Sequence, residues 1–153
     1  MINYVAGLLF SPSGEHVLLI RKNRPEWQRG KLNGIGGHIE DGEAPLAAMI
    51  REFKEETGMT VKNWKHFCNL VGKDWQVEWF KSFDDLADML TLSAIDKCNE
   101  GEINWHPVQS VVNGGGLPIP NMKWLLMLAL DKDDVTAVVT EPGGSEFGSK
   151  KGG

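Results

Sequence analysis

Short apolar runs alternate with turn-forming residues along most of the chain. Runs that are rich in Val, Ile, Leu, Phe and Trp, and that end at Gly, Pro, Asn or Asp, predict β-strands. The expected strands cover residues 5–10, 16–20, 64–71, 75–83, 102–112 and 135–140, with a short strand through Ile35 and Ile39. Residues 11–14 and 72–74 carry the small and polar side chains that favour tight turns between neighbouring strands.

A different periodicity marks the helices. Residues 45–57 have Pro45 in the first turn and Gly58 directly after the end, which are the favoured places for these residues. A rotation of about 100° per residue gathers one set of side chains on a common side. That set is Leu46, Met49, Ile50, Phe53 and Thr57. Shorter helices are expected over residues 84–92 and 122–130.

Strands mixed with helices, without internal repeats, predict an α/β fold with a mixed β-sheet between helices. The 153 residues are enough for one domain with a sizeable core and few for two. We expect that single domain to cover residues 1–140. Residues 141–153 are rich in Gly, Ser and Lys and predict a flexible tail, and their Gly-Ser-Glu-Phe-Gly-Ser run is also typical of vector-encoded sequence.

Composition narrows the classes of partner and the compartment. A formal net charge of −5 argues against a nucleic-acid polymer as the main partner, because phosphate backbones are bound by clustered Lys and Arg. The apolar run near the N-terminus predicts a strand rather than a signal peptide, and no run is long enough to span a bilayer. Cys68 and Cys98 lack metal-site spacing. They allow one disulfide, although free thiols in a reducing cytosol are favoured. We therefore expect a cytoplasmic monomer or homodimer.

Three carboxylates dominate one flank of the expected helix over residues 45–57. Glu52, Glu55 and Glu56 lie away from its apolar side, and like charges so close together destabilise a helix. A hard cation such as Mg²⁺ would relieve the repulsion, because it prefers carboxylate and phosphate oxygens. The alternative is an ordinary amphipathic helix with a solvated acidic face. Gly37, Glu43 and Gly58 lie at fixed distances from these glutamates, and the pattern they complete bears on the choice.

The spacing follows the pattern G-x5-E-x7-R-E-U-x-E-E-x-G-U, where U is a bulky apolar residue. The residues that fill it are Gly37, Glu43, Arg51, Glu52, Phe53, Glu55, Glu56, Gly58 and Met59. This segment resembles the Nudix box. The resemblance implies an α/β/α sandwich and a nucleotide diphosphatase that hydrolyses a phosphoanhydride bond in nucleoside diphosphate derivatives, with Mg²⁺ or, as a substitute, Mn²⁺. It also implies that Arg51 and Glu43 orient the other carboxylates rather than touch substrate.

The same resemblance assigns the metal ligands. It implies that Gly37 binds through its main-chain carbonyl and that Glu56 is the most constant side-chain ligand. Glu55 is a further ligand, and Glu52 is either a ligand or the general base. Members of the family differ in the identity of that base.

A further carboxylate often reaches the metal from far along the chain in this family. Glu102 opens the expected strand over residues 102–112 and is the candidate, with Glu100 as the alternate. An exposed acidic turn explains Glu102 equally simply and is the favoured explanation for Glu100.

The segment Asn-Gly-Ile-Gly-Gly at residues 33–37 resembles Nudix enzymes that remove oxidised purine nucleoside triphosphates such as 8-oxo-dGTP. In those relatives an Asn binds the base, a Trp of a late strand stacks on it, and a basic residue contacts phosphate. Asn33, Trp105 and Lys22 occupy the matching places. The Trp-His-Pro run at residues 105–107 lacks the paired Asp residues that some of these relatives use. A turn role for Asn33 and core packing for Trp105 are the simpler alternatives.

The sequence thus predicts a Mg²⁺-dependent nucleoside triphosphate pyrophosphohydrolase of the house-cleaning type, which releases nucleoside monophosphate and pyrophosphate. One alternative is a hydrolase of ADP-ribose, a dinucleotide or another nucleoside diphosphate derivative. Another is a non-catalytic Nudix module that senses a nucleotide. Such modules usually lose glutamates of the box, and this chain keeps them.

Overall fold

The computed structural model describes residues 1–84 and 101–141. Its strands are β1 (Ile2–Phe10), β2 (His16–Lys22), β3 (Leu32–Asn33), β4 (Ile35–His38), β5 (Lys65–Val71), β6 (Trp75–Phe83), β7 (Gly101–Pro107) and β8 (Ala137–Thr140). Its helices are α1 (Pro45–Thr57), α2 (Val108–Val112), α3 (Met122–Ala129) and the short 3-10 helix η1 (Glu26–Gln28). The expected helix over 84–92, apart from its first residue, lies outside the described residues, as do Cys98, Glu100 and nearly all of the expected tail.

All eight strands belong to one mixed sheet. The order is β3-β2-β1-β6-β5-β8, with β4 also pairing with β1 and β7 with β2. β1 runs parallel to β6 along its whole length, from the pair Ile2 and Trp75 to the pair Phe10 and Phe83. β5 and β8 are also parallel, whereas the other pairs are antiparallel. The strand that opens the chain is therefore in the middle of the sheet.

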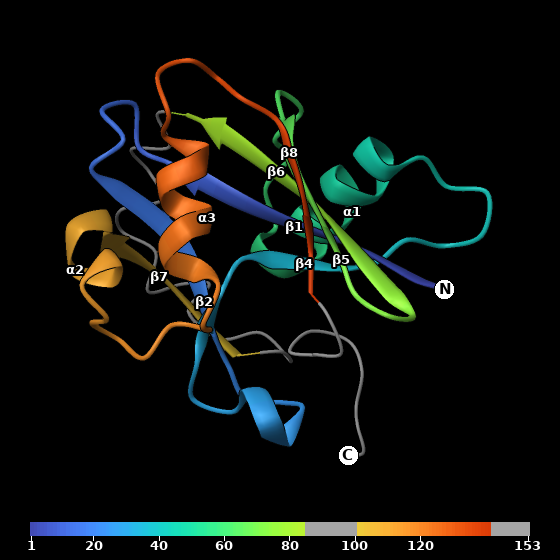
Figure 1. The fold of residues 1–153 in the computed structure, drawn as a ribbon, viewed down its shortest axis with the longest axis horizontal. Helices are drawn as coiled ribbons and strands as arrows, with labels where there is room; N and C mark the ends of the chain where they lie inside the picture. Colours follow the sequence, from blue (N-terminus) through green and yellow to red (C-terminus); the bar gives the residue numbers. More distant parts are fainter. Residues whose placement is uncertain (85–100, 142–153) are drawn as a thin grey trace.

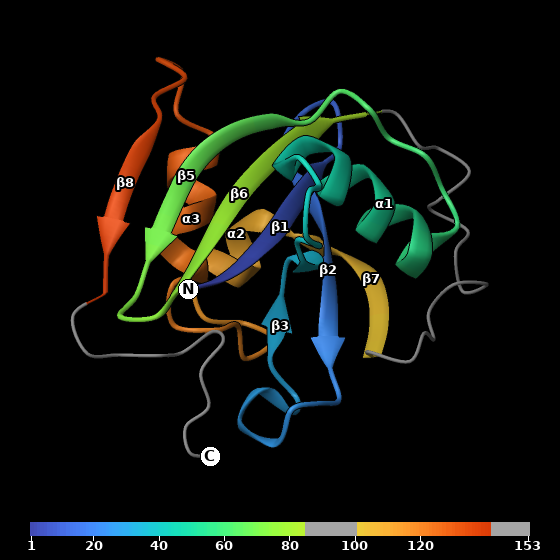
Figure 2. The ribbon, with the colours of Figure 1, turned by 90° about the vertical axis from the view of Figure 1, so that its right-hand side faces the viewer.

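Helices cover both faces of this sheet (Figures 1 and 2). One face forms a buried cluster with α2 and α3, and the other forms a cluster with α1. Alternation along β1 divides its side chains between them: Leu8 and Phe10 join the first cluster, and Val5 and Leu9 join the second. The expected α/β/α sandwich is confirmed. Trp64, Trp75 and Trp79 are buried in these clusters. They are between 0% and 7% exposed.

Helix α1 has the expected bounds, and Gly58 ends it with a left-handed φ of 80°. Its buried residues are Ala48, Met49, Phe53 and Thr57. The expectation that Leu46 is buried was wrong, because its side chain is 42% exposed. Periodicity gives the angular position of a side chain, but not whether a neighbouring element reaches that turn of the helix.

The strand expected over residues 102–112 was wrong in its second half. β7 ends at Pro107, and residues 108–112 form α2 instead. Val108 and Val111 are buried there at helical spacing, and the Val108 N–H donates to the carbonyl of Glu15. A run of β-branched residues fits either a strand or a short buried helix, and here the packing of α2 against α3 decides for the helix.

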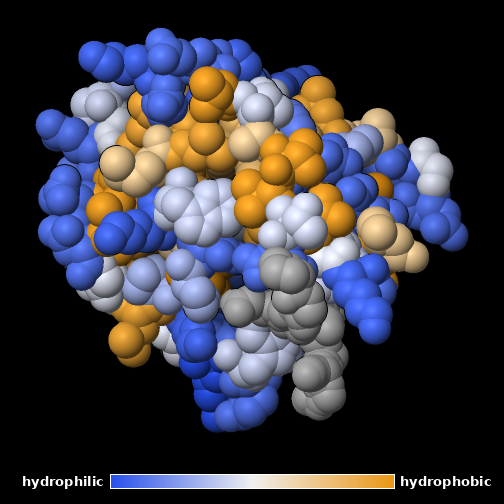
Figure 3. All heavy atoms as spheres, in the orientation of Figure 1, coloured by the Kyte–Doolittle hydropathy of each residue, from blue (hydrophilic) through white to orange (hydrophobic). Residues whose placement is uncertain are grey.

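The surface is mixed in character. The face that carries α3 and β8 shows apolar atoms among charged ones (Figure 3), and Met127 and Val138 are among the exposed apolar side chains of the chain. Within the described residues, no helix has the length and apolar character that crossing a membrane requires.

Candidate active site

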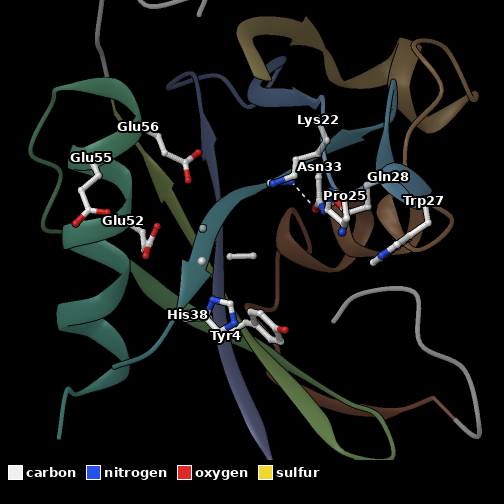
Figure 4. A pocket seen from close by; sticks show the side chains of 14 residues that line it. Tyr4, Lys22, Pro25, Trp27, Gln28, Asn33, His38, Glu52, Glu55 and Glu56 are labelled. Atoms are coloured by element: carbon white, nitrogen blue, oxygen red, sulfur yellow. Dashed lines mark hydrogen bonds between the residues drawn. The ribbon is translucent and has the colours of Figure 1, made fainter. Parts of the chain in front are cut away.

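A cavity of about 460 Å³ lies between α1 and the glycine-rich segment of β3 and β4. Its volume is within the usual range for small-molecule sites. Glu52, Glu55 and Glu56 line it from α1, and Lys22 and Asn33 line it from β2 and β3. Figure 4 shows the glutamates on one side and Asn33 with Lys22 on the other. The cavity therefore has an acidic half and a half suited to hydrogen bonding.

Arg51 organises the acidic half. Its Nε and Nη2 donate to the two carboxylate oxygens of Glu43 at 2.7 and 2.9 Å, which makes a bidentate pair. Its Nη1 donates to Glu52 at 2.9 Å and to Glu55 at 3.2 Å. Nη2 also donates to the carbonyl of His38 at 3.0 Å, which ties α1 to the end of β4. A planar guanidinium has enough donors in a fixed fork to hold three carboxylates at once.

The pKa values of Glu43 and Glu52 are shifted in opposite directions, because contacts with Arg51 dominate at Glu43 and burial dominates at Glu52. The hydrogen bonds from Arg51 and from the Glu40 N–H lower the pKa of Glu43 from its usual 4.5 to about 2. Burial raises the pKa of Glu52, although its bond with Arg51 opposes this. The pKa of Arg51 is raised, chiefly by its hydrogen bond to Glu43. Glu43 is thus a fixed anion, and Glu52 is poised to accept a proton more readily than an ordinary carboxylate.

Gly37 approaches Glu52 too closely for any side chain. A Cβ built on Gly37 would lie 2.5 Å from the carboxylate carbon of Glu52. The absence of a side chain lets the Glu52 carboxylate pack directly against the main chain of β4. The main chain of Gly37 and the carboxylate of Glu52, two of the expected metal ligands, are therefore adjacent.

The donor set fits a hard divalent cation in its chemistry. Glu52, Glu55, Glu56 and Gly37 line one cavity, and carboxylate and carbonyl oxygens are the ligands that Mg²⁺ prefers. Among the described residues, no three His, Cys, Asp or Glu side chains already converge on one point. The carboxylates that Arg51 holds would have to rotate towards such an ion.

The structure separates two of the expected residues from this cavity. Trp105 is not among the residues that line it, and packs against the buried cluster beneath α1. Its position matches the simpler alternative of core packing. Glu102 is exposed and lines a neighbouring cavity together with Arg21 and Lys22. The structure thus does not bring Glu102 together with the three glutamates of α1.

Sequence reasoning missed Tyr4, Trp27, Gln28 and His38, which also line the cavity. Residues 25–31 contain η1, which carries Trp27 and the buried Gln28. A lone Trp inside a polar loop next to Asn33 was the available signal. Tyr4 and His38 are partners across β1 and β4, with ring centroids 4.6 Å apart. Only the pairing of two distant strands reveals that contact.

Comparisons with known proteins match the chain to a family model and to curated relatives. The family model described as the NUDIX domain matches residues 2–125. The uncharacterized Nudix hydrolase YvcI of Bacillus subtilis (strain 168) is 34% identical over 104 residues, which are 65% of this chain and 63% of that protein. The ADP-sugar pyrophosphatase of Mus musculus is 48% identical over 44 residues, which are 29% of this chain and 20% of that protein.

Solved structures share the fold. The MutT protein from Bacillus halodurans superposes with a TM-score of 0.72 and 24% identity, covering 93% of this chain and 90% of that one. This likeness shows that the two chains share the fold. The chain spans less than two thirds of the length of the two curated relatives.

Proposed function

This chain belongs to the NUDIX family, and from that premise we propose that it is a Mg²⁺-dependent nucleoside triphosphate pyrophosphohydrolase. It cleaves a phosphoanhydride bond and releases nucleoside monophosphate and pyrophosphate. The observation that carries the proposal is the single cavity that joins the glutamates of α1 to Asn33 and Lys22. Purine nucleotides, including oxidised ones such as 8-oxo-dGTP, are the proposed substrates, because Asn33 lines the cavity opposite the glutamates.

The residues that would hold a divalent ion are Gly37, through its carbonyl, and the carboxylates of Glu52, Glu55 and Glu56. Such an ion, when bound, neutralises charge on phosphate oxygens and makes water a better nucleophile. The family generally uses divalent metal ions, and Mg²⁺ is the proposed one here, with Mn²⁺ as a substitute. Glu102 remains a candidate for an additional ligand only if it moves out of its neighbouring cavity.

The protein's own side chains supply the remaining steps. Glu52 is either one of the metal ligands or, where it does not bind the ion, the proton acceptor for the attacking water, since its carboxylate lines the cavity beside the other two glutamates. Arg51 holds Glu52 in place and is itself anchored by Glu43. Lys22 faces the cavity from the end of β2 and would contact the phosphates, while Asn33 would bind the base.

A second candidate function is hydrolysis of an ADP-sugar or a related nucleoside diphosphate derivative. The match to the mouse ADP-sugar pyrophosphatase favours it, although that match spans only 44 residues. Both candidates use the same acidic half of the cavity. Their substrates differ in the group attached to the second phosphate, which is a third phosphate in a nucleoside triphosphate and a sugar in an ADP-sugar.

A nucleotide panel tests the proposal. The protein is incubated with Mg²⁺ and each of dGTP, 8-oxo-dGTP, dATP, ADP-ribose and GDP-mannose, and products are separated by chromatography. We expect monophosphate and pyrophosphate from triphosphates. Turnover of only the sugar nucleotides would overturn the triphosphate assignment, and binding without any product would indicate a sensing module.

The variant Glu56→Gln tests the metal assignment. Loss of an outer-shell partner in metal sites costs about 10–100-fold, so loss of a ligand should lower kcat by more than ~100-fold. The matched control is Glu15→Gln, which makes the same change at an exposed side chain before β2. Near-normal turnover by Glu56→Gln would contradict the assignment.

A further inference from the structure

Gln28 is a buried amide on the wall of the cavity. Gln28 is 5% exposed, although it belongs to the 3-10 helix η1 near the surface of the molecule. The main chain already closes this turn: the Gln28 N–H donates to Pro25 and the Lys31 N–H donates to Gln28. The turn therefore does not require the amide side chain. A buried amide is costly unless its hydrogen-bonding groups are used.

Neighbouring contacts fix which end of the Gln28 amide faces the cavity. The Gly34 N–H donates to Oδ1 of Asn33 at 2.7 Å, so the opposite end of the Asn33 amide must be the nitrogen. That nitrogen contacts the Gln28 amide at 3.0 Å, so the Gln28 atom in the contact must be the oxygen. One backbone N–H thus sets the orientation of both side chains.

The nitrogen of Gln28 is left with two N–H donors. Within residues 1–84 and 101–141, it donates to no protein acceptor. Gln28, Asn33 and Trp27 line the same cavity, opposite the glutamates (Figure 4). The wall that would meet a base therefore offers hydrogen-bond donors beside an indole ring, on which a base can stack.

We propose that Gln28 determines base specificity by donating to the 6-oxo group of a purine. This inference rests on the proposed function, since it assumes a nucleotide with its phosphates at the acidic half. Guanine presents two neighbouring acceptors, O6 and N7, whereas adenine presents an amino donor in place of O6. A donor wall therefore favours guanine and hypoxanthine nucleotides and rejects adenine nucleotides. A well-placed contact of this kind discriminates by about 10–100-fold.

The variant Gln28→Glu reverses the polarity of that wall. One carboxylate oxygen can still accept from Asn33, while the other replaces the N–H donors with an acceptor. We measure kcat/KM at alkaline pH for the triphosphates dGTP, dITP and dATP. We also measure it for two sugar nucleotides, GDP-mannose with a guanine base and ADP-ribose with an adenine base. The wild type should prefer dGTP and dITP over dATP. Gln28→Glu should lower that preference at least ~10-fold, with activity on dATP kept or raised.

The pattern across substrates separates this role from a structural one. A variant that merely loosens the turn would lose activity on all bases together, and thermal unfolding reports its folding directly. The matched control is Gln109→Glu on α2, an exposed site outside the cavity, which should leave the base preference unchanged. A preference that Gln28→Glu leaves within about twofold of wild type overturns the inference, as does a wild type that prefers dATP.

The two proposals fail in different ways. If only the sugar nucleotides are hydrolysed, the triphosphate function fails. The role of Gln28 is then tested by how far Gln28→Glu changes the ratio of kcat/KM for GDP-mannose to kcat/KM for ADP-ribose. If nothing is hydrolysed, calorimetric dissociation constants for dGTP and dATP replace the kinetic ratio. Equal constants in the wild type would then overturn the role of Gln28.

Discussion

Replacing Glu43 by Gln removes one charge from the bidentate pair that anchors Arg51. The pair joins the turn before α1 to the middle of that helix, with both contacts shorter than 3 Å. The side chain of Glu43 is 16% exposed and that of Arg51 is 26% exposed. A glutamine keeps the size and one acceptor, so the substitution removes the charge together with one of the two hydrogen bonds.

The lowered pKa of Glu43 gives the size of the effect. A fall from 4.5 to about 2 corresponds to about 3 kcal/mol of stabilisation at neutral pH, and partial solvent exposure reduces this to about 2 kcal/mol. Because the pKa is lower in the folded state, this contribution is fully present above 4.5 and is lost as the pH falls towards 2. The difference between wild type and variant should therefore shrink to roughly half near pH 3.

Urea unfolding followed by tryptophan fluorescence measures both values. We expect Glu43→Gln to lower the free energy of unfolding by about 2 kcal/mol at neutral pH and by about 1 kcal/mol near pH 3. The exposed control Glu15→Gln should change it by less than about 0.5 kcal/mol. An equal loss at both pH values would refute the reasoning, because it would show that the charge of Glu43 is not what stabilises α1.

Gly37, Glu52 and Cys68 each support a further measurement. Gly37→Ala would push the Glu52 carboxylate away by forcing a contact of 2.5 Å. It should lower kcat by about 100-fold, and unchanged steady-state kinetics would contradict the close approach. The raised pKa of Glu52 predicts that wild-type kcat/KM falls on the acid side with an apparent pKa above the usual 4.5. The residual activity of Glu52→Gln should lack that fall, so an identical pH profile would exclude Glu52 as the base. Burial raises the pKa of Cys68 to about 11. In a Cys98→Ser background, a thiol reagent near pH 8 should label the protein only on unfolding, and rapid labelling of folded protein would contradict the burial.

The acidic half of the site could be predicted because its determinants are local. Pro45, Gly58 and the helical spacing of the glutamates specify α1 and its bounds within one short segment. The partners of Arg51 lie within the same segment, with the most distant one at His38. Helix geometry alone brings Arg51 next to Glu55.

The other half could not be predicted because strand pairing over long distances builds it. Alternation places Ile103 and Trp105 on one face of β7, but it does not say which helix covers that face. Pairing of β7 with β2 puts both residues in the cluster beneath α1. Gln28 and Trp27 enter the cavity because η1 folds back towards Asn33, and no periodic pattern in residues 25–31 encodes that turn.

The parallel pairing of β1 with β6 has a consequence for the order in which the protein can fold during synthesis. β1 and the whole of α1 leave the ribosome before β6 exists, so β1 lacks one of its neighbours while the segment that carries the glutamates of α1 is already complete. Long-range pairing of this kind closes late and slowly. A nascent chain that stops before Trp75 should therefore expose one edge of β1 and depend on chaperones, and the acidic segment should bind no metal tightly until that strand is paired.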